Sequence, residues 1–294
     1  MKAAYIQNGE VLVGDMPDPV PSRGQALVRT HSCGMCASEQ HFLHSGRNVI
    51  DLSRQYGGPY ARLDFARPFV PGHEYVGEVI DYGPGSKRTV PTGRRVTSVP
   101  VMRHAGGHSV IGFSHECPGG WGELMLLDEN VLMEIPSDLD DDMAAMTEPL
   151  AVGLEHARRG RPTRDDAVLV IGCGAIGLGV IAGLKLMGIA PIIAADFHRA
   201  RRDAAIGMGV MGGYCMEAER FYVFAAQNKR LTVHFAAGEE QQDMELALRS
   251  IADGSIDVRP WLRERIGLGA VAEAVARMSG PLAPIRNVID PRRM

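Results

Sequence analysis

Four side chains among the first 148 residues of the chain are of the types that hold a catalytic metal ion. Cys36 offers a thiolate, His73 an imidazole, and Glu74 and Glu148 offer carboxylates. Sulfur, nitrogen and oxygen ligands together suit a zinc ion that keeps its fourth position open for a reactant. Taken singly, each residue is better explained as an ordinary buried or surface side chain. The combination predicts a catalytic zinc site and leaves the choice between the two glutamates open.

A glycine-rich turn further along the chain has the pattern of a dinucleotide site. Residues 172–177 read Gly-Cys-Gly-Ala-Ile-Gly, after a strand predicted over Ala167–Ile171 and before a helix predicted over Leu178–Met187. In this pattern the glycines make the tight turn, admit the pyrophosphate and let the helix pack on the strand. The helix amino terminus attracts the phosphates. The expected cofactor-binding residues are Gly172, Gly174, Ala175, Ile176, Gly177 and Asp196.

Asp196 ends a second predicted strand, Pro191–Asp196, about 20 residues beyond the last glycine of the turn, as in dinucleotide sites. A carboxylate there accepts hydrogen bonds from the ribose hydroxyls and repels a 2′-phosphate. NAD is therefore expected in preference to NADP. Three nearby arginines could soften this preference, although a solvated helix face explains them better: Arg199, Arg201 and Arg202.

The elements that must position these groups differ between the two halves of the chain. Residues 1 to about 135 consist of short apolar runs broken by Gly and Pro, such as Tyr75–Ile80, which predicts an antiparallel β domain. The stretch Arg47–Pro71 shows no sustained period and is predicted to be a long, substrate-facing loop. Asp142–Val152 has helical spacing interrupted by one proline, which indicates a hinge near residue 150. Ala167–Ile171 is uniformly apolar, as expected for a parallel strand buried on both faces.

Composition narrows the class of protein. The 294 residues, 45% hydrophobic and 22% charged, favour two domains. A net charge of −4 without a basic face argues against nucleic acid or a membrane surface as a partner. No apolar leader or spanning segment is evident, so a cytoplasmic location is expected. The odd number of cysteines, five, favours thiol or metal chemistry over disulfides.

The stretches Cys33–His41 and Pro71–Val79 resemble the two zinc motifs of the zinc-dependent alcohol dehydrogenases, in the medium-chain dehydrogenase/reductase family. Thr147–Val152, Gly93–Val96 and Gly119–Glu123 resemble further family motifs, in family order. The resemblance implies an α/β plus β fold. A GroES-like antiparallel β catalytic domain would span 1–150, a Rossmann-type doubly wound parallel sheet 151–236, and a return to the catalytic domain 237–294.

The same resemblance implies one catalytic zinc, held by Cys36, His73 and Glu148, with Glu74 behind them or alternating as a ligand. Ser38 and His41 match the hydroxyl and imidazole that pass the alcohol proton to solvent in relatives, although a capping serine and a surface histidine are the alternatives. Cys33 is not expected to bind metal. Relatives with a second, structural zinc carry four clustered cysteines, whereas residues 100–120 hold only Cys117, so no structural zinc is expected.

The activity implied is hydride transfer between an alcohol, polyol or sugar-like substrate, or the corresponding carbonyl, and NAD. Zinc would act as the Lewis acid for loss of the alcohol proton. Glu148 in place of a third cysteine resembles the polyol dehydrogenases. The resemblance also suggests a homodimer or homotetramer.

The resemblance breaks after a helix predicted over Arg201–Gly209. Met211–Glu217 runs quickly into Lys229–Phe235, which resembles the last strand of the family's nucleotide domain. About two βαβ units are missing, so the Rossmann sheet is expected to be shortened and the strand after Gly188 to expose an apolar face. One alternative is therefore a catalytically impaired relative that binds zinc or a ligand but not NAD productively. A zinc lyase or hydrolase is a third hypothesis, which the intact phosphate-binding turn disfavours.

Overall fold

The fold is taken from a computed structural model that describes residues 1–104, 107–196, 239–278 and 285–294. These residues divide into two units. Unit 1 comprises Met1–Ala151 and Glu240–Met294, and unit 2 comprises Val152–Glu239. The helix predicted over 201–209, the segment 211–217 and the strand predicted over 229–235 lie outside the described residues.

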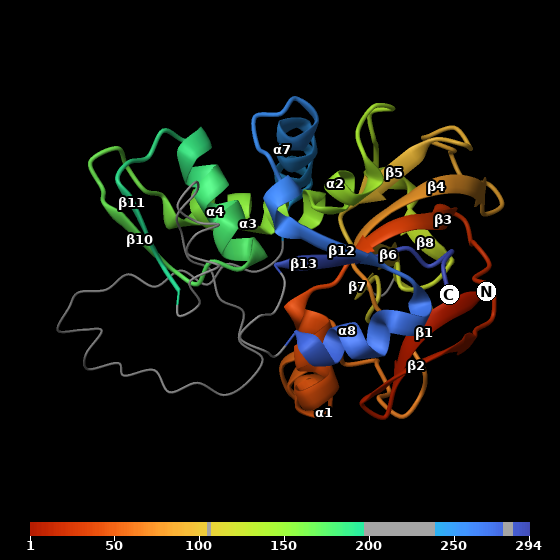
Figure 1. The fold of residues 1–294 in the computed structure, drawn as a ribbon. Helices are drawn as coiled ribbons and strands as arrows, with labels where there is room; N and C mark the ends of the chain where they lie inside the picture. The colour runs from red at the N-terminus through yellow and green to blue at the C-terminus, as the bar shows by residue number, and fades with distance from the viewer. Residues whose placement is uncertain (105–106, 197–238, 279–284) are drawn as a thin grey trace. The chain divides into compact units, whose positions relative to one another are not determined.

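Unit 1 is built on a seven-stranded sheet with strand β3 at its centre (Figure 1). Its strands follow the order β12-β13-β3-β4-β5-β9, and β8 also pairs with β3. Of the described strand pairs in this sheet, only β12 with β13 is parallel. The strands are β3 (Gln25–Gly34), β4 (Glu74–Tyr82), β5 (Arg95–Ser98), β8 (Leu124–Asp128), β9 (Leu132–Glu134), β12 (Leu262–Ile266) and β13 (Arg286–Ile289).

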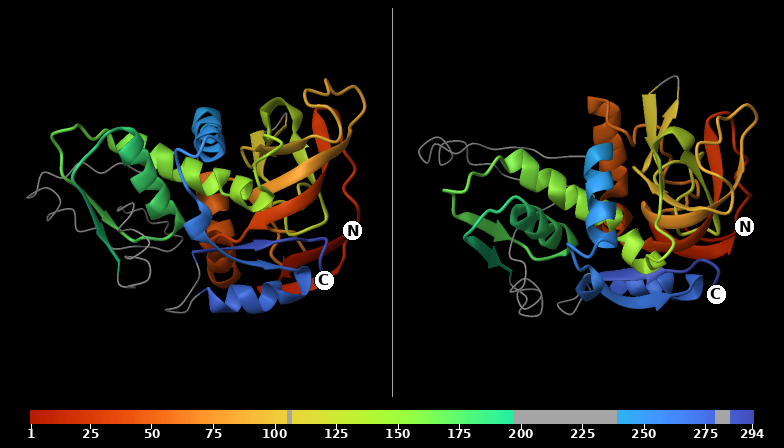
Figure 2. Two further views of the ribbon diagram at one scale, coloured as in Figure 1. Left: turned by 45° about the horizontal axis from the view of Figure 1, so that its top comes forward. Right: turned by 90° about the horizontal axis from the view of Figure 1, so that it is seen from above.

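The carboxyl-terminal segment completes this sheet. Strand β13 is buried at all four residues and pairs antiparallel with β3, with Val288 opposite Gly34 and Ile289 opposite Cys33. Strand β13 therefore lies between β12 and β3 in the sheet, and the blue carboxyl-terminal strands run next to the red-orange β3 (Figures 1 and 2). Residues more than 200 positions apart in the sequence meet at the end of β3.

Shorter elements surround the sheet of unit 1. Two antiparallel hairpins are formed by β1 (Lys2–Gln7) with β2 (Glu10–Asp15) and by β6 (Val101–His104) with β7 (Gly107–Val110). The helices are α1 (Ala37–Tyr56), α2 (Asp141–Ala145), α7 (Gln241–Ala252) and α8 (Val271–Arg277), with 3-10 turns at Glu129–Val131, Arg259–Trp261 and Leu268–Ala270. Alternating side chains of the strands form a common core that includes Val28, Val79 and Met125, and Trp121, in the segment before β8, packs into it.

The loop prediction for Arg47–Pro71 is wrong for its first ten residues, which continue helix α1. The helix buries Phe42, Gly46, Val49, Ile50 and Ser53, a spacing of three and four residues typical of one helical face. Polar residues within this stretch, and the glycines directly after it at 57 and 58, concealed the period. The helix ends where Gly57 takes a left-handed conformation, φ 76°, and closes the last turn.

Unit 2 shows a β-α-β order among its described residues. Strand β10 (Val168–Ile171) pairs in parallel with β11 (Ile192–Ala195), and helix α4 (Ala175–Leu186) connects them. Helix α3 begins in unit 1 and continues into unit 2 (Thr147–Gly160). The two helices approach closely because small residues face one another: Gly153 lies against Gly179, and Ala157 against Gly183.

The prediction that β10 is buried on both faces is wrong. Val170 is buried, but Leu169 and Ile171, which alternate with it, are 54% and 47% exposed. Ile193, the cross-strand partner of Leu169, is 54% exposed, which confirms the apolar face expected on the strand after Gly188. Among the described residues this sheet has two strands, and one of its faces is not covered.

No helix in the described part of the chain combines the length and the apolar character that crossing a membrane requires.

Candidate metal centre and cofactor turn

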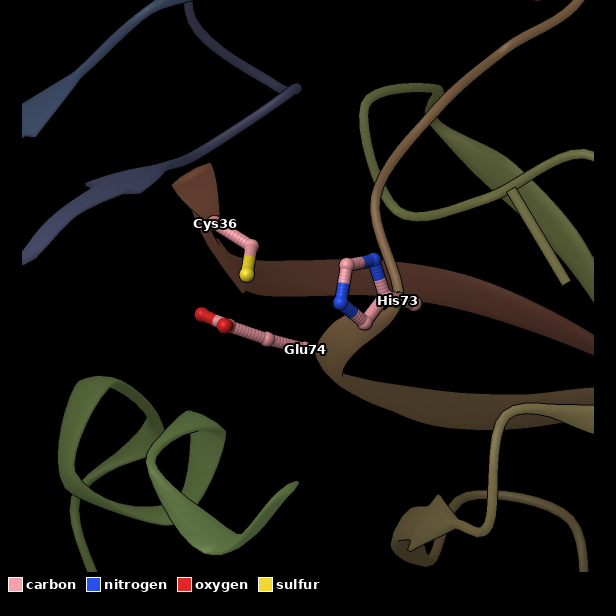
Figure 3. Close-up of side chains that lie close together, drawn as sticks. All are labelled: Cys36, His73 and Glu74. Carbon is pink, nitrogen blue, oxygen red and sulfur yellow. The ribbon is translucent and has the colours of Figure 1, made fainter. Parts of the chain in front are cut away.

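Strand β3 brings the candidate metal ligands together. Gly34, its last residue, pairs with Glu74, the first residue of β4, and His73 immediately precedes that strand. Cys36 follows two residues later as the N-cap of α1. One ligand atom from each of Cys36, His73 and Glu74 lies within 4.8 Å of the others, and their side chains point toward one another (Figure 3).

The imidazole of His73 lies against the carboxylate of Glu39, a residue that the metal-binding motifs did not indicate. Oε1 of Glu39 lies 2.7 Å from Nδ1 of His73, and Oε2 of Glu39 accepts a hydrogen bond of 2.8 Å from the Cys36 backbone N–H. Both contacts come from the first turn of α1, where a carboxylate three residues after the N-cap satisfies the open backbone donor. Nε2 is thus the ring nitrogen left to face a metal, the usual arrangement of metal-binding histidines.

Glu148 stands on the other side of His73. It follows Thr147, the first residue of α3, and its Oε1 lies 4.0 Å from Nε2 of His73. Its side chain is buried. The structure thereby brings all four predicted ligands to one place and sets both glutamates beside the cysteine and histidine.

Arg286 supplies a positive charge at the same place. Its Nη2 donates a hydrogen bond of 2.6 Å to Oε1 of Glu74 and lies 3.6 Å from Sγ of Cys36. The guanidinium is buried, and continuation of the β3–β13 register places Arg286 opposite Cys36. Nothing in the sequence indicated this residue, because the pairing that delivers it joins distant segments.

Burial and neighbouring charge shift the protonation equilibria of these groups in competing directions. Burial raises the pKa of Glu74, although Arg286 and His73 oppose the shift. Burial favours a low pKa for His73, but Glu39 and Cys36 raise the pKa of this imidazole well above its usual range. Buried negative charge thus exceeds the positive charge that Arg286 provides, an environment that favours binding of a cation.

A zinc ion fits this arrangement. Cysteine, histidine and glutamate are a donor set that zinc accepts. Oε2 of Glu74 is buried and has no hydrogen-bond partner among the described residues. Cys36, His73 and Glu148 or Glu74 would hold the ion.

The predicted proton route starts beside this site. Ser38 is half-buried near the start of α1, and its hydroxyl has no hydrogen-bond partner among the described residues. His41 lies on the next turn of the same helix and is exposed to solvent. No hydrogen bond joins the two side chains in the described structure, so a substrate or a water molecule would have to connect them.

An aromatic cluster packs against the metal centre. The ring of Phe113 lies 5.7 Å from the ring of His73 and 5.0 Å from that of Phe42. Tyr60 and Phe69 pack on the same rings. Rings on this side limit the access of water to His73 and present an apolar surface to any carbon chain bound there.

Cys33 is buried in the core, three residues before Cys36. Burial raises the pKa of its thiol well above the ordinary value, with nearby Glu39 adding to the shift. Its Sγ donates to the carbonyl oxygen of Gly34 at 3.4 Å. A thiol held in its protonated form is a poor metal ligand.

In unit 2, the glycine-rich turn joins β10 to α4. Gly172 has a φ of 100°, which favours glycine. Gly174 is the N-cap of α4, and a Cβ built on it meets no atom of the described residues within 4 Å, so they leave room for a ligand there. Ala175, Ile176 and Gly177 form the first turn of the helix, whose N–H groups suit a phosphate.

Asp196 lies at the end of β11, beside the turn. Its Oδ2 accepts a hydrogen bond of 2.8 Å from the backbone N–H of Cys173. This contact places a carboxylate next to the glycines, where the pattern predicts the ribose. The turn and the carboxylate together fit a dinucleotide.

Comparisons with known proteins place these features in a family. The alcohol dehydrogenase GroES-like domain matches residues 22–137. The (R,R)-butanediol dehydrogenase of Bacillus subtilis is 30% identical over 220 residues, which cover 72% of this chain and 62% of that protein. The sorbitol dehydrogenase of the same species is 27% identical over 222 residues, 71% of this chain and 59% of that protein. The chain thus spans about three fifths of the length of these relatives.

Solved structures share the fold. A zinc-binding dehydrogenase from Sinorhizobium meliloti bound to NADP superposes with a TM-score of 0.80 at 19% identity, over 99% of each chain. An alcohol dehydrogenase (rspB) from E. coli CFT073 complexed with NADH gives a TM-score of 0.81 at 19% identity, again over 99% of each chain. The predicted fold class, a GroES-like domain with a Rossmann-type sheet, is confirmed. Residues 22–137 thus carry an alcohol dehydrogenase GroES-like domain, and the relatives and solved structures support a zinc-type medium-chain alcohol and polyol dehydrogenase family for the chain.

Proposed function

We propose that this protein is a zinc- and NAD-dependent oxidoreductase that transfers a hydride between a small alcohol or polyol, or the matching carbonyl compound, and the nicotinamide. The observation that carries the proposal is the buried cluster of Cys36, His73 and Glu74, with Glu148 beside it. Zinc bound there would supply Lewis-acid chemistry that eases loss of the alcohol proton.

The remaining residues have separate roles in this proposal. Glu39 fixes the ring of His73, so that Nε2 faces the cluster. Ser38 receives the alcohol proton and His41, exposed on the same helix, passes it to solvent. Asp196 binds the ribose hydroxyls and favours NAD.

The relatives support a polyol or diol as the substrate class. Their names specify butanediol, sorbitol and, for a Mycolicibacterium smegmatis protein that is 31% identical over 196 residues, erythritol or L-threitol. One zinc per chain, a cytoplasmic location and a homodimer or homotetramer complete the proposal. No comparison supports the alternative of an impaired relative.

The test is a calorimetric titration of the purified protein with NADH, with zinc content measured on the same sample. We expect micromolar binding and about one zinc per chain, as for a working dehydrogenase. Cys36→Ser should lose zinc and polyol oxidation together, whereas Cys117→Ser, at a buried cysteine outside the cluster, should retain both. Absence of NADH binding, or full zinc content in Cys36→Ser, would refute the proposal.

A further inference from the structure

We infer that His115 is a positioning residue for the aromatic wall of the metal centre. In its neutral form it holds the segment 64–69, which carries part of that wall, and protonation of its ring loosens the segment. The effect on substrate binding rests on the proposed function, whereas the hydrogen bonds of His115 do not.

Both ring nitrogens of His115 contact the backbone of this segment. The N–H of Asp64 donates to Nε2 at 3.0 Å, and Nδ1 lies 3.2 Å from the carbonyl oxygen of Pro68. A carbonyl oxygen can only accept, so Nδ1 must carry the proton, and Nε2 must be bare to accept from Asp64. One neutral tautomer satisfies both contacts. A ring protonated on both nitrogens loses the contact with Asp64, because Nε2–H would face another N–H.

The segment that His115 holds reaches the metal centre through packed rings. Phe69, at its end, is buried and packs on Phe42. The ring of Phe69 also lies 6.3 Å from that of Phe113, which lies 5.7 Å from the ring of His73. Because His115 follows Phe113 by two residues, its hydrogen bonds join the two chain segments that form this wall.

Strand β1 holds the same segment by contacts that do not titrate. The N–H of Ile6 donates to the carbonyl oxygen of Phe69 at 2.9 Å, and the N–H of Asn8 donates to that of Phe65 at 2.9 Å. Protonation of His115 should therefore free the segment at Asp64 without detaching it from β1. The expected change is local and leaves the fold intact.

The charged groups around His115 allow its ring to become positive. Glu116 is the next residue, and Arg62, on the opposing segment, lies 3.7 Å from its carboxylate. Burial opposes ionisation of Glu116, but Ser114 and Arg62 hold the pKa of this carboxyl below its ordinary value. Asp64 adds a second carboxylate on the opposing segment. Two carboxylates against one guanidinium favour a positive ring, and histidine side chains ordinarily titrate between about pH 5 and pH 8.

The experiment measures hydrogen exchange of the Asp64 backbone amide in the full-length protein, after correction for the intrinsic exchange rate at each pH. Protection of this amide should fall about tenfold from about pH 8 to about pH 5, as expected for the loss of one hydrogen bond. The amide of Phe69, which donates to the carbonyl oxygen of Ile6 at 3.1 Å, should keep its protection. Nitrogen NMR of the ring at the higher pH should show the proton of His115 on Nδ1.

His115→Gln separates titration of the ring from its bulk. The amide side chain offers an acceptor and a donor but does not titrate, so protection of the Asp64 amide should be equal at the two pH values. His108→Gln, a control at an exposed histidine of β7, should keep the pH dependence of the parent. In the parent, the KM for butanediol should rise about threefold more on acidification than in His115→Gln, while kcat changes alike in both proteins.

Three results would each overturn the inference: a proton on Nε2 of His115 in the neutral ring, protection of the Asp64 amide that does not depend on pH, or the same pH dependence in His115→Gln as in the parent. Equal KM profiles of the two proteins would overturn the link to substrate binding. Absence of polyol oxidation by the parent would instead refute the proposed function, and hydrogen exchange would still decide the role of His115.

Discussion

The side chain of Glu39 shows how one residue can serve both a fold and a site. It satisfies the backbone N–H at the start of α1 and contacts Nδ1 of His73 at 2.7 Å. A carboxylate behind a metal-binding histidine fixes the ring and makes its other nitrogen a better donor.

Glu39→Gln should weaken zinc binding by about 10- to 100-fold, because the amide lacks the charge that supports the imidazole. Competition with a chelator of known affinity measures the change. Glu10→Gln, at an exposed position of the same unit, is the control and should bind as the parent does. Equal affinity in Glu39→Gln would show that this carboxylate serves the helix alone.

The predicted preference for NAD over NADP depends on Asp196. Asp196→Ala removes the group that accepts from the ribose hydroxyls and repels a 2′-phosphate, so the preference for NAD over NADP should narrow. The ratio of kcat/KM values with the two cofactors is the measurement. Asp165→Ala, at an exposed aspartate of unit 2, should keep the parent ratio. The assignment fails if Asp196→Ala keeps it as well.

At the scale of elements, the close approach of α3 to α4 depends on Gly153. A Cβ on this residue would lie 2.5 Å from the Cα of Gly179, a backbone atom that cannot yield without moving the helix. The packing of these two helices is thus decided by small residues and not by large apolar side chains.

Gly153→Ala should lower the free energy of unfolding by about 1–3 kcal/mol, as expected for overpacking. Urea denaturation gives the value. In the control, Gly160→Ala, the new Cβ would meet, among the residues that the structure describes, only Pro162 Cδ, at 3.8 Å, so the substitution should be neutral or mildly stabilising. Similar stability of the two variants would indicate that α3 and α4 are less tightly packed than they are in the structure.

At the scale of the whole molecule, a charge network joins the carboxyl-terminal segment to the rest of unit 1. Arg265 of β12 pairs with Asp142 at the start of α2 and with Asp290, 3.1 Å away, after β13. Its Nη2 also donates to the backbone carbonyl of His31 at 3.0 Å. Asp141 pairs with Arg95 at 2.6 Å and with His31 at 3.3 Å. The network ties the segments that carry Cys36, Glu148 and Arg286.

These pairs predict how stability depends on pH. Burial opposes ionisation of Asp290, but Arg292 and Arg265 outweigh it and lower the pKa from 3.8 to about 2. Burial likewise opposes ionisation of Asp141, but hydrogen bonds from His31 and Arg95 lower the pKa from 3.8 to about 2. A folded-state pKa below the unfolded value stabilises the protein above about pH 4, and this contribution is lost as the pH falls toward 2.

Asp290→Asn should therefore lower the free energy of unfolding at pH 7 by about 2 kcal/mol. As the pH falls, the variant should lose less further stability than the parent protein does. Urea midpoints at pH 7, 4 and 3 test this. Asp138→Asn, at an exposed position, should follow the parent curve. Parallel acid profiles for Asp290→Asn and the parent would contradict the assignment.

Several features of this molecule could be read from residue order because they are local. A turn of three glycines between an apolar strand and an apolar helix forms from short-range preferences, and β10, α4 and β11 lie where the pattern predicts them. The ability to bind a metal can also be read from residue type, because cysteine, histidine and glutamate have the same ligand atoms wherever they lie. The sequence by itself therefore determined the family and the predicted ligands.

Other features arise only when distant strands pair. The register of β3 with β4 and β13 brings Glu74 and Arg286 to Cys36. The residue type at position 286 does not by itself predict that this arginine lies there. Leu169 and Ile171 look like core residues, yet they are exposed because burial depends on what covers a strand, not on its own composition. Helix α1 extends through Tyr56 with Val49, Ile50 and Ser53 buried, on the same face as Phe42, whose ring packs against Phe65 and Phe69. Tertiary structure decided these points, because each depends on a contact between segments that are far apart in the sequence. Residue order alone does not show that such segments lie close together.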